Sequence, residues 1–124
     1  MTDARPTAAG RLTTHVLDTM RGQPGAGIAI ELFRLAGDHR RRLGGATTNA
    51  DGRAPPLLEG AALQAGTYEL VFHVGEYFRG HGVSLTEPAF LEQVPVRFGI
   101  ADAAGHYHVP LLISPYGYAT YRGS

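Results

Sequence analysis

Residues 66–74 read GTYELVFHV and give the clearest strand signal in the chain. Apolar side chains occupy every second position from Tyr68 to Val74, and residues of mixed character fall between them. Because successive side chains of a β-strand point to opposite faces, this period of two predicts a strand with one face in the core.

The same short alternation, interrupted by Gly, Pro, Asn and Asp, recurs on both sides of this segment. Further strands are predicted at residues 11–18, 27–35, 39–48, 90–98, 106–114 and 116–121. Residues 75–80 suit one helical turn, and the two prolines within 54–58 suit an edge segment or a loop. Seven or eight short strands at this spacing predict an all-β sandwich or barrel with at most one short helix.

The length of 124 residues, with 44% hydrophobic residues, predicts a single domain. We expect this domain to span residues 11–124, and the small and polar residues 1–10 to form a disordered leader. The formal net charge is zero, which argues against a nucleic-acid partner held by phosphate contacts.

Cysteine is absent from the chain, which excludes disulfides and thiolate catalysis. The sequence has no apolar run that resembles a secretory signal or approaches the roughly 20 residues of a membrane span. We therefore expect a soluble, cytoplasmic protein without a membrane partner.

Three of the six histidines fall at positions where they can act together. His106 and His108 share one face of the predicted strand 106–114. Positions 107, 109, 111 and 113 on the opposite face are more continuously apolar and are expected to form the core. The two histidines therefore face outward, onto solvent or another subunit, and His15 faces outward by the same argument in segment 11–18.

Three interpretations of these histidines compete on the residues alone. They can be surface or hydrogen-bonded side chains with a structural role only. Alternating histidines on a strand are also a known metal-ligand spacing, but the sequence fixes no third ligand, so we predict no metal site. A neutral imidazole, with an ordinary pKa of about 6.5, is well suited to general acid–base catalysis near neutrality.

Arg53 closes a predicted turn at residues 49–53, where Asn, Asp and Gly allow a tight backbone. Most turn arginines are solvated, but a rigidly held guanidinium can clamp paired carbonyl oxygens of a substrate. By pattern alone, Tyr121 is expected to pack a last strand or an interface.

Four segments, in this order along the chain, resemble the 5-hydroxyisourate hydrolases, a transthyretin-related enzyme family. They are LTTHVLD at 12–18, TNADGR at 48–53, HYHVPLL at 106–112 and SPYGYATYRGS at 114–124. The resemblance covers about residues 11–124. Ala119 departs from the family pattern, in which Ser or Thr is frequent, at a position expected to be peripheral to the chemistry.

The resemblance implies a transthyretin-like sandwich of two four-stranded sheets with one short helix. It implies a homotetramer whose active sites lie at the dimer–dimer interface and need no metal or organic cofactor. The implied reaction cleaves the N1–C6 ring amide of 5-hydroxyisourate, giving 2-oxo-4-hydroxy-4-carboxy-5-ureidoimidazoline in urate breakdown. The implied catalytic residues are His15, Arg53, His108 and Ser124, and Tyr121 joins the first three in binding the substrate.

The implied mechanism leaves the identity of the general base open. A neutral His15 or His108 removes a proton from the attacking water, and Arg53 stabilises the developing negative charge. The hydroxyl and carboxylate of Ser124 are expected to position water or a histidine.

The main alternative function is that of a non-catalytic carrier, because transthyretin carries thyroid hormone in the equivalent channel of the same fold. An apolar channel lining would favour the carrier, and a polar lining would favour the enzyme. A sugar-binding sandwich is a remoter alternative, which would require exposed aromatic platforms that the sequence does not indicate.

Overall fold

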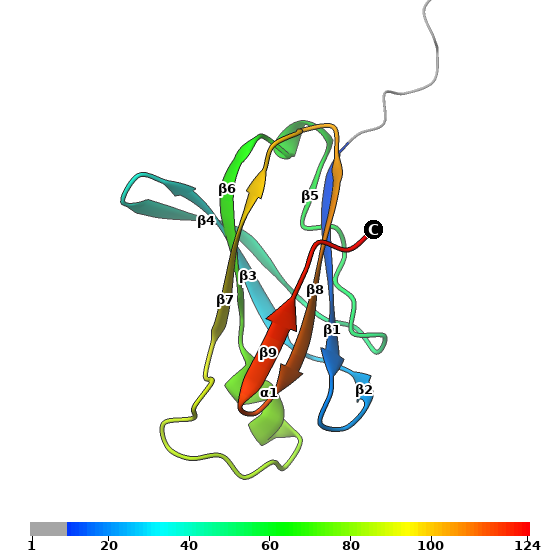
Figure 1. Cartoon of the computed structure of the whole chain (residues 1–124), viewed down its shortest axis with the longest axis vertical. Coiled ribbons are helices and arrows are strands. Elements are labelled where there is room, and N and C mark those ends of the chain that lie inside the picture. Colours follow the sequence, from blue (N-terminus) through cyan, green and yellow to red (C-terminus); the bar gives the residue numbers. More distant parts are fainter. Residues whose placement is uncertain (1–9) are drawn as a thin grey trace, which may run out of the picture.

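Two β-sheets packed face to face form the protein, whose computed structural model describes residues 10–124 (Figure 1). The strands are β1 (Arg11–Asp18), β2 (Gln23–Pro24), β3 (Ala29–Ala36), β4 (His39–Thr47), β5 (Leu58–Glu59), β6 (Gly66–Phe72), β7 (Val94–Ile100), β8 (His106–Ser114) and β9 (Gly117–Thr120). A single 3₁₀ turn, η1 (Gly60–Ala62), and one α-helix, α1 (Val74–Gly80), complete the described elements.

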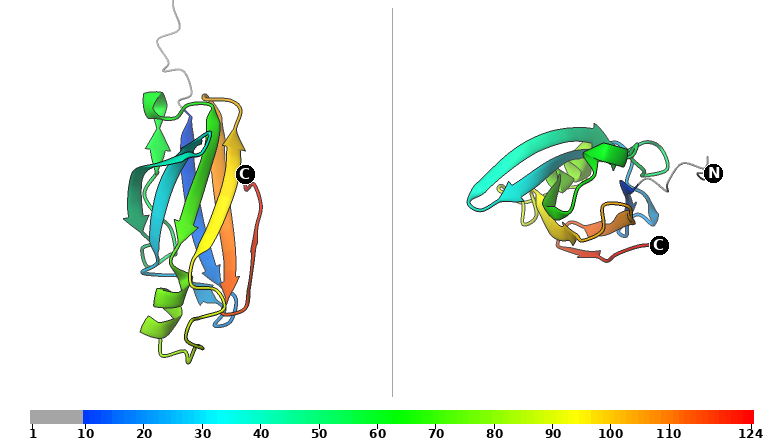
Figure 2. Two further views of the ribbon diagram at one scale, coloured as in Figure 1. Left: turned by 90° about the vertical axis from the view of Figure 1, so that its left-hand side faces the viewer. Right: turned by 90° about the horizontal axis from the view of Figure 1, so that it is seen from above.

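One sheet has the strand order β2-β1-β8-β9, with β5 paired to β1 beyond this path, and the other has the order β4-β3-β6-β7. β1 and β8 run parallel, and all other pairings are antiparallel. Seen from above, the two sheets form two distinct layers (Figure 2). The predicted transthyretin-like sandwich with one short helix is confirmed, and the short β5 is an addition to the predicted four-stranded sheet.

The core between the sheets follows the predicted alternation. Leu12, Thr14 and Val16 of β1 are buried, as are Tyr107 and the other odd-numbered residues of β8. The side chains at positions 13, 15, 106 and 108 therefore belong to the outer face of the first sheet. The fold thus brings β1 and β8 side by side with their polar positions on the same surface.

Several element boundaries differ from the predicted ones. β6 ends at Phe72 rather than at residue 74, because Val74 begins α1 and packs in the core from the helix. The strand predicted at 90–98 begins only at Val94, and Phe90 lies exposed against Tyr116 in an irregular loop. Between 54 and 58 only Leu58 joins a strand, as expected for a proline-containing edge segment.

Gly10, the last residue of the predicted leader, packs against the rest of the fold. Most of the predicted leader, residues 1–9, lies outside the described residues. Gly10 is buried, and its carbonyl oxygen accepts a hydrogen bond from the Gly60 N–H at 2.9 Å. A side chain at this position would meet the Ala103 carbonyl oxygen, so Gly10 is part of the folded domain.

Helix α1 is fixed to the end of β1 by a buried hydrogen bond. The Tyr77 hydroxyl donates to Asp18 Oδ2 at 2.7 Å, and the backbone N–H groups of Met20 and Arg21 donate to Asp18 Oδ1. Burial and the neighbouring Asp18 carboxylate raise the pKa of Tyr77 to about 12. Within residues 10–124, no helix is long and apolar enough to cross a membrane.

Candidate active site

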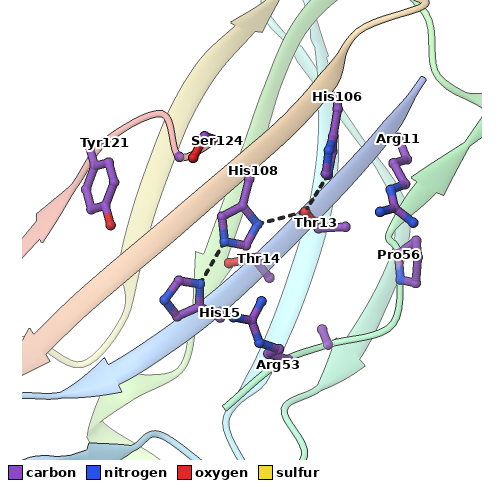
Figure 3. Close-up of a pocket in the computed structure, with 12 residues that line it drawn as sticks. Arg11, Thr13, Thr14, His15, Arg53, Pro56, His106, His108, Tyr121 and Ser124 are labelled. Carbon is purple, nitrogen blue, oxygen red and sulfur yellow. Dashed lines mark hydrogen bonds between the residues drawn. The ribbon is translucent and has the colours of Figure 1, made fainter. Parts of the chain in front are cut away.

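A cavity of about 500 Å³ opens on the outer face of the first sheet (Figure 3). It is lined by Arg11, Thr13, Thr14, His15, Arg53, Ala54, Pro56, His106, His108, Tyr121, Gly123 and Ser124. The five site residues expected from the family resemblance all lie in this lining. Residues from β1, the turn at 49–53, β8 and the C-terminal segment therefore converge on one space.

The parallel register of β1 and β8 brings the polar side chains together. Thr13 lies opposite His108, and Arg11 lies opposite His106. All four side chains point to the outer face of the sheet, so residues that are more than ninety positions apart in the sequence share one surface.

His15 and His108 form a directly hydrogen-bonded pair. His15 Nδ1 lies 2.7 Å from His108 Nε2, and the two rings are inclined by 20° with centroids 4.9 Å apart. His108 Nδ1 lies 2.7 Å from Thr13 Oγ1, so both ring nitrogens of His108 are engaged. Within residues 10–124, His15 Nε2 has no hydrogen-bond partner and remains available to a bound molecule.

Burial and positive charge keep this histidine pair neutral. Burial lowers the pKa of His15 below its ordinary value of about 6.5, and the Arg53 guanidinium lowers it further. The pKa of His108, which is only 9% exposed, is lowered by burial first and then by its neighbours His15, Arg53 and His106. Near neutral pH, both imidazoles therefore have a lone pair that can accept a proton.

Arg53 reaches the site from a rigid turn. Asn49 Oδ1 accepts hydrogen bonds from the backbone N–H groups of Asp51 and Arg53, at 2.9 and 3.1 Å. Gly52 adopts a φ of +74°, and its carbonyl oxygen accepts a hydrogen bond from the Val16 N–H at 2.8 Å. This docking onto β1 pairs the backbones of Arg53 and His15 and sets the guanidinium beside the His15 ring (Figure 3).

The C-terminal segment closes the other side of the cavity. The Gly123 N–H donates to the His108 carbonyl oxygen at 2.8 Å, and a Cβ at Gly123 would come within 2.7 Å of His108 Cδ2. Only glycine lets the chain pass this close to the ring. Arg122 points away and stacks over the Tyr107 ring at 4.1 Å, whereas Tyr121 and Ser124 line the cavity.

Thr13 is a site residue that the sequence reasoning missed. Its hydroxyl lies within hydrogen-bonding distance of two histidines, at 2.7 Å from His108 Nδ1 and 3.2 Å from His106 Nε2. The sequence signal for Thr13 was its place two residues before His15, which puts both side chains on the same face of the strand. Among residues 10–124, no group of three His, Cys, Asp or Glu side chains could hold a metal ion.

The fold and the site together define a transthyretin-like sandwich with a histidine–arginine site suited to acid–base chemistry. A sequence model of the HIUase/Transthyretin family matches residues 12–123, and the chain belongs to this family.

Similar proteins agree with this membership. 5-Hydroxyisourate hydrolase 2 of Rhizobium meliloti is 65% identical over 117 residues, which cover 94% of this chain and 98% of the relative. The structure of Klebsiella pneumoniae 5-hydroxyisourate hydrolase is 34% identical, with a TM-score of 0.78 and coverage of 93% of this chain and 99% of that one. The crystal structure of (S)-allantoin synthase is 45% identical with a TM-score of 0.89, where the match covers 94% of this chain and 44% of that one.

Proposed function

We propose that this protein hydrolyses 5-hydroxyisourate at its N1–C6 ring amide, as a step of urate catabolism. The observation that supports this most directly is the hydrogen-bonded His15–His108 pair beside Arg53 in a polar cavity. Hydrolysis of a cyclic amide needs a base that deprotonates the attacking water and a positive charge that stabilises the oxyanion formed from the carbonyl oxygen. The family's relatives named 5-hydroxyisourate hydrolase support the choice of substrate.

His15 is the general base of the proposed reaction. The two ring nitrogens of His108 are occupied by His15 and Thr13, whereas His15 Nε2 is open to the cavity. The lowered pKa of His15 keeps this nitrogen unprotonated near neutrality. His15 removes a proton from the attacking water, and His108 holds the His15 ring in the orientation that this transfer requires.

Arg53 binds the carbonyl oxygens of the substrate and stabilises the oxyanion at C6. Its fixed turn orients a planar donor group in the cavity without further reorganisation. Tyr121 lies on the C-terminal side of the cavity and contacts the substrate, while the Ser124 hydroxyl positions the water or a histidine. These residue roles are part of the proposal.

The polar lining disfavours the carrier function. A carrier of a hydrophobic hormone requires apolar walls, because charged groups without partners are costly to desolvate around such a ligand. The described lining has two arginines and three histidines, and its only wholly aliphatic side chains are those of Ala54 and Pro56. A small, oxygen-rich bicycle satisfies these donors, whereas a large apolar ligand leaves them unpaired.

The purified protein is expected to accelerate the decay of 5-hydroxyisourate. The substrate is generated in place by urate oxidase, and its ultraviolet absorbance is followed with and without the protein. The expected result is a decay rate that rises in proportion to protein concentration. If the protein binds 5-hydroxyisourate in a fixed molar ratio but leaves its decay rate unchanged, the carrier function is favoured instead.

The assembly proposed for this activity is a homotetramer with the cavity facing the dimer–dimer interface. β9 ends its sheet path with an open edge, and Tyr116, Tyr118 and Tyr121 expose much of their aromatic surface. An exposed edge strand with aromatic side chains suits association with further copies. Light scattering coupled to gel filtration is expected to give the mass of four chains, and a monomer would contradict the assembly.

A cytoplasmic location of the protein is also part of the proposal.

A further inference from the structure

Four side chains on the outer face of the first sheet form one continuous chain of hydrogen-bonding atoms. His15 Nδ1 meets His108 Nε2 at 2.7 Å, His108 Nδ1 meets Thr13 Oγ1 at 2.7 Å, and Thr13 Oγ1 meets His106 Nε2 at 3.2 Å. Figure 3 shows Thr13 between the rings of His106 and His108. The chain runs from the open nitrogen of His15 through the buried His108 to the exposed His106.

The single hydroxyl hydrogen of Thr13 gives this chain a direction. A hydroxyl donates one hydrogen bond, so Thr13 donates to one of its two histidines and accepts from the other. When Thr13 accepts from His108 Nδ1–H, His108 Nε2 accepts from His15 Nδ1–H, and His15 Nε2 has its lone pair toward the cavity. When Thr13 donates to His108 Nδ1 instead, every bond is reversed and His15 Nε2 bears a hydrogen. The first arrangement presents a base, and the second presents an acid.

We propose that Thr13 joins His106 to the catalytic pair in a proton relay that ends at the exposed His106 ring, in the lining of the same cavity. The relay rests on the proposed function, because it begins at the base of that reaction. A proton from the attacking water binds His15 Nε2, and the Nδ1 proton of His15 passes to His108 Nε2. The Nδ1 proton of His108 passes to Thr13, the Thr13 hydroxyl proton passes to His106 Nε2, and His106 releases its Nδ1 proton to solvent.

Each imidazole is neutral again after the transfer and has changed only its tautomer. His15 then has an Nε2–H that protonates the departing N1 of the cleaved amide, and the relay runs in reverse to restore the first arrangement. In the relay Thr13 is a positioning residue, and His106 is the group that exchanges protons with solvent.

Charge in the cavity favours a relay over a stored proton. Arg11 and Arg53 line the same cavity as the histidines, together with Tyr121 and the C-terminal residue Ser124. A lasting imidazolium at His15 or His108 would be partly buried and close to Arg53, which disfavours it. Passing the proton on to water at the exposed His106 avoids a lasting charge on any imidazole of the relay.

Thr13→Val tests the relay, because it removes the hydroxyl and keeps the shape and the strand propensity. We expect kcat to fall about tenfold, the factor that loss of one hydrogen bond produces. Thr13→Ser is expected to recover most of the rate. Thr67→Val, at an exposed threonine of β6 in the opposite sheet, is the matched control and is expected to keep the wild-type rate. Melting curves of all variants identify any that fail to fold.

His106→Ala provides the readout that a structural role would not change. Its kcat is expected to fall in dilute buffer and to recover as imidazole buffer is added, because a diffusing base replaces the lost proton acceptor. The wild-type rate should depend little on buffer concentration. A His106→Ala rate equal to that of the wild type in dilute buffer would overturn the role of His106.

Nitrogen-15 NMR of the histidine rings tests the chain without substrate. In the resting wild type, His108 is expected to be the Nδ1–H tautomer and His15 to have an unprotonated Nε2. Thr13→Val should change the His108 tautomer populations, and unchanged ring shifts would overturn the relay. If the wild type fails to hydrolyse 5-hydroxyisourate, the proposed function is wrong, but the ring shifts still decide whether Thr13 sets the tautomers.

Discussion

Replacing His15 with alanine is expected to lower kcat by roughly 10²–10⁴-fold, the range that one general base contributes. His15 presents the one imidazole nitrogen of the pair that is open to the cavity, and His108 cannot take its place because both of its nitrogens are engaged. His15 is partly exposed on the outer face, so its loss should alter the melting temperature little. Initial rates of 5-hydroxyisourate decay measure the effect.

His39→Ala is the matched control for this variant, because His39 is exposed on β4 in the opposite sheet. It should keep the wild-type rate. The double variant of His15 and His108 should lose little more than His15→Ala alone, because residues that act as one unit are not additive. A near-normal rate of a folded His15→Ala protein would show that another residue is the general base. Additive losses in the double variant would show that the two histidines act independently.

The sequence predicted the sandwich because its strands have a regular alternation, and this alternation also placed the histidines outward. Position parity is a local property of a strand, so it survives folding at positions 15, 106 and 108. The ends of the strands were less predictable. Val74 continues the alternation of the strand before it, but the chain turns into α1 there, and only tertiary packing distinguishes the two outcomes.

The contact between His15 and His108 could not be predicted from parity alone. It requires the parallel pairing of β1 with β8, which brings strands from opposite ends of the chain together. Without that register, neither the choice of base nor the part played by Thr13 could be inferred. The family resemblance supplied the set of residues, and the geometry supplies the order in which they are connected.

Replacing Arg53 with alanine is expected to lower kcat by roughly 10²–10³-fold, the cost of removing one preorganised oxyanion donor. It should also move the acid limb of the pH–rate profile. The base must be neutral, so activity falls as the pH drops through the pKa of His15, which burial and then Arg53 lower from its ordinary value of about 6.5. Removing the guanidinium raises that pKa and shifts the limb to higher pH. Initial rates measured over roughly pH 4 to 9, the range in which a histidine base titrates, test both effects.

Arg53→Lys separates the charge of Arg53 from its shape. Lysine keeps the positive charge, so the acid limb should stay near its wild-type position, but it lacks the planar fork and should recover only part of the rate. Arg41→Ala removes an exposed arginine of β4 in the opposite sheet and should change neither quantity. Near-normal turnover by folded Arg53→Ala would exclude the oxyanion role. An unmoved acid limb in Arg53→Ala would show that burial alone, the larger of the two causes, sets the pKa of His15.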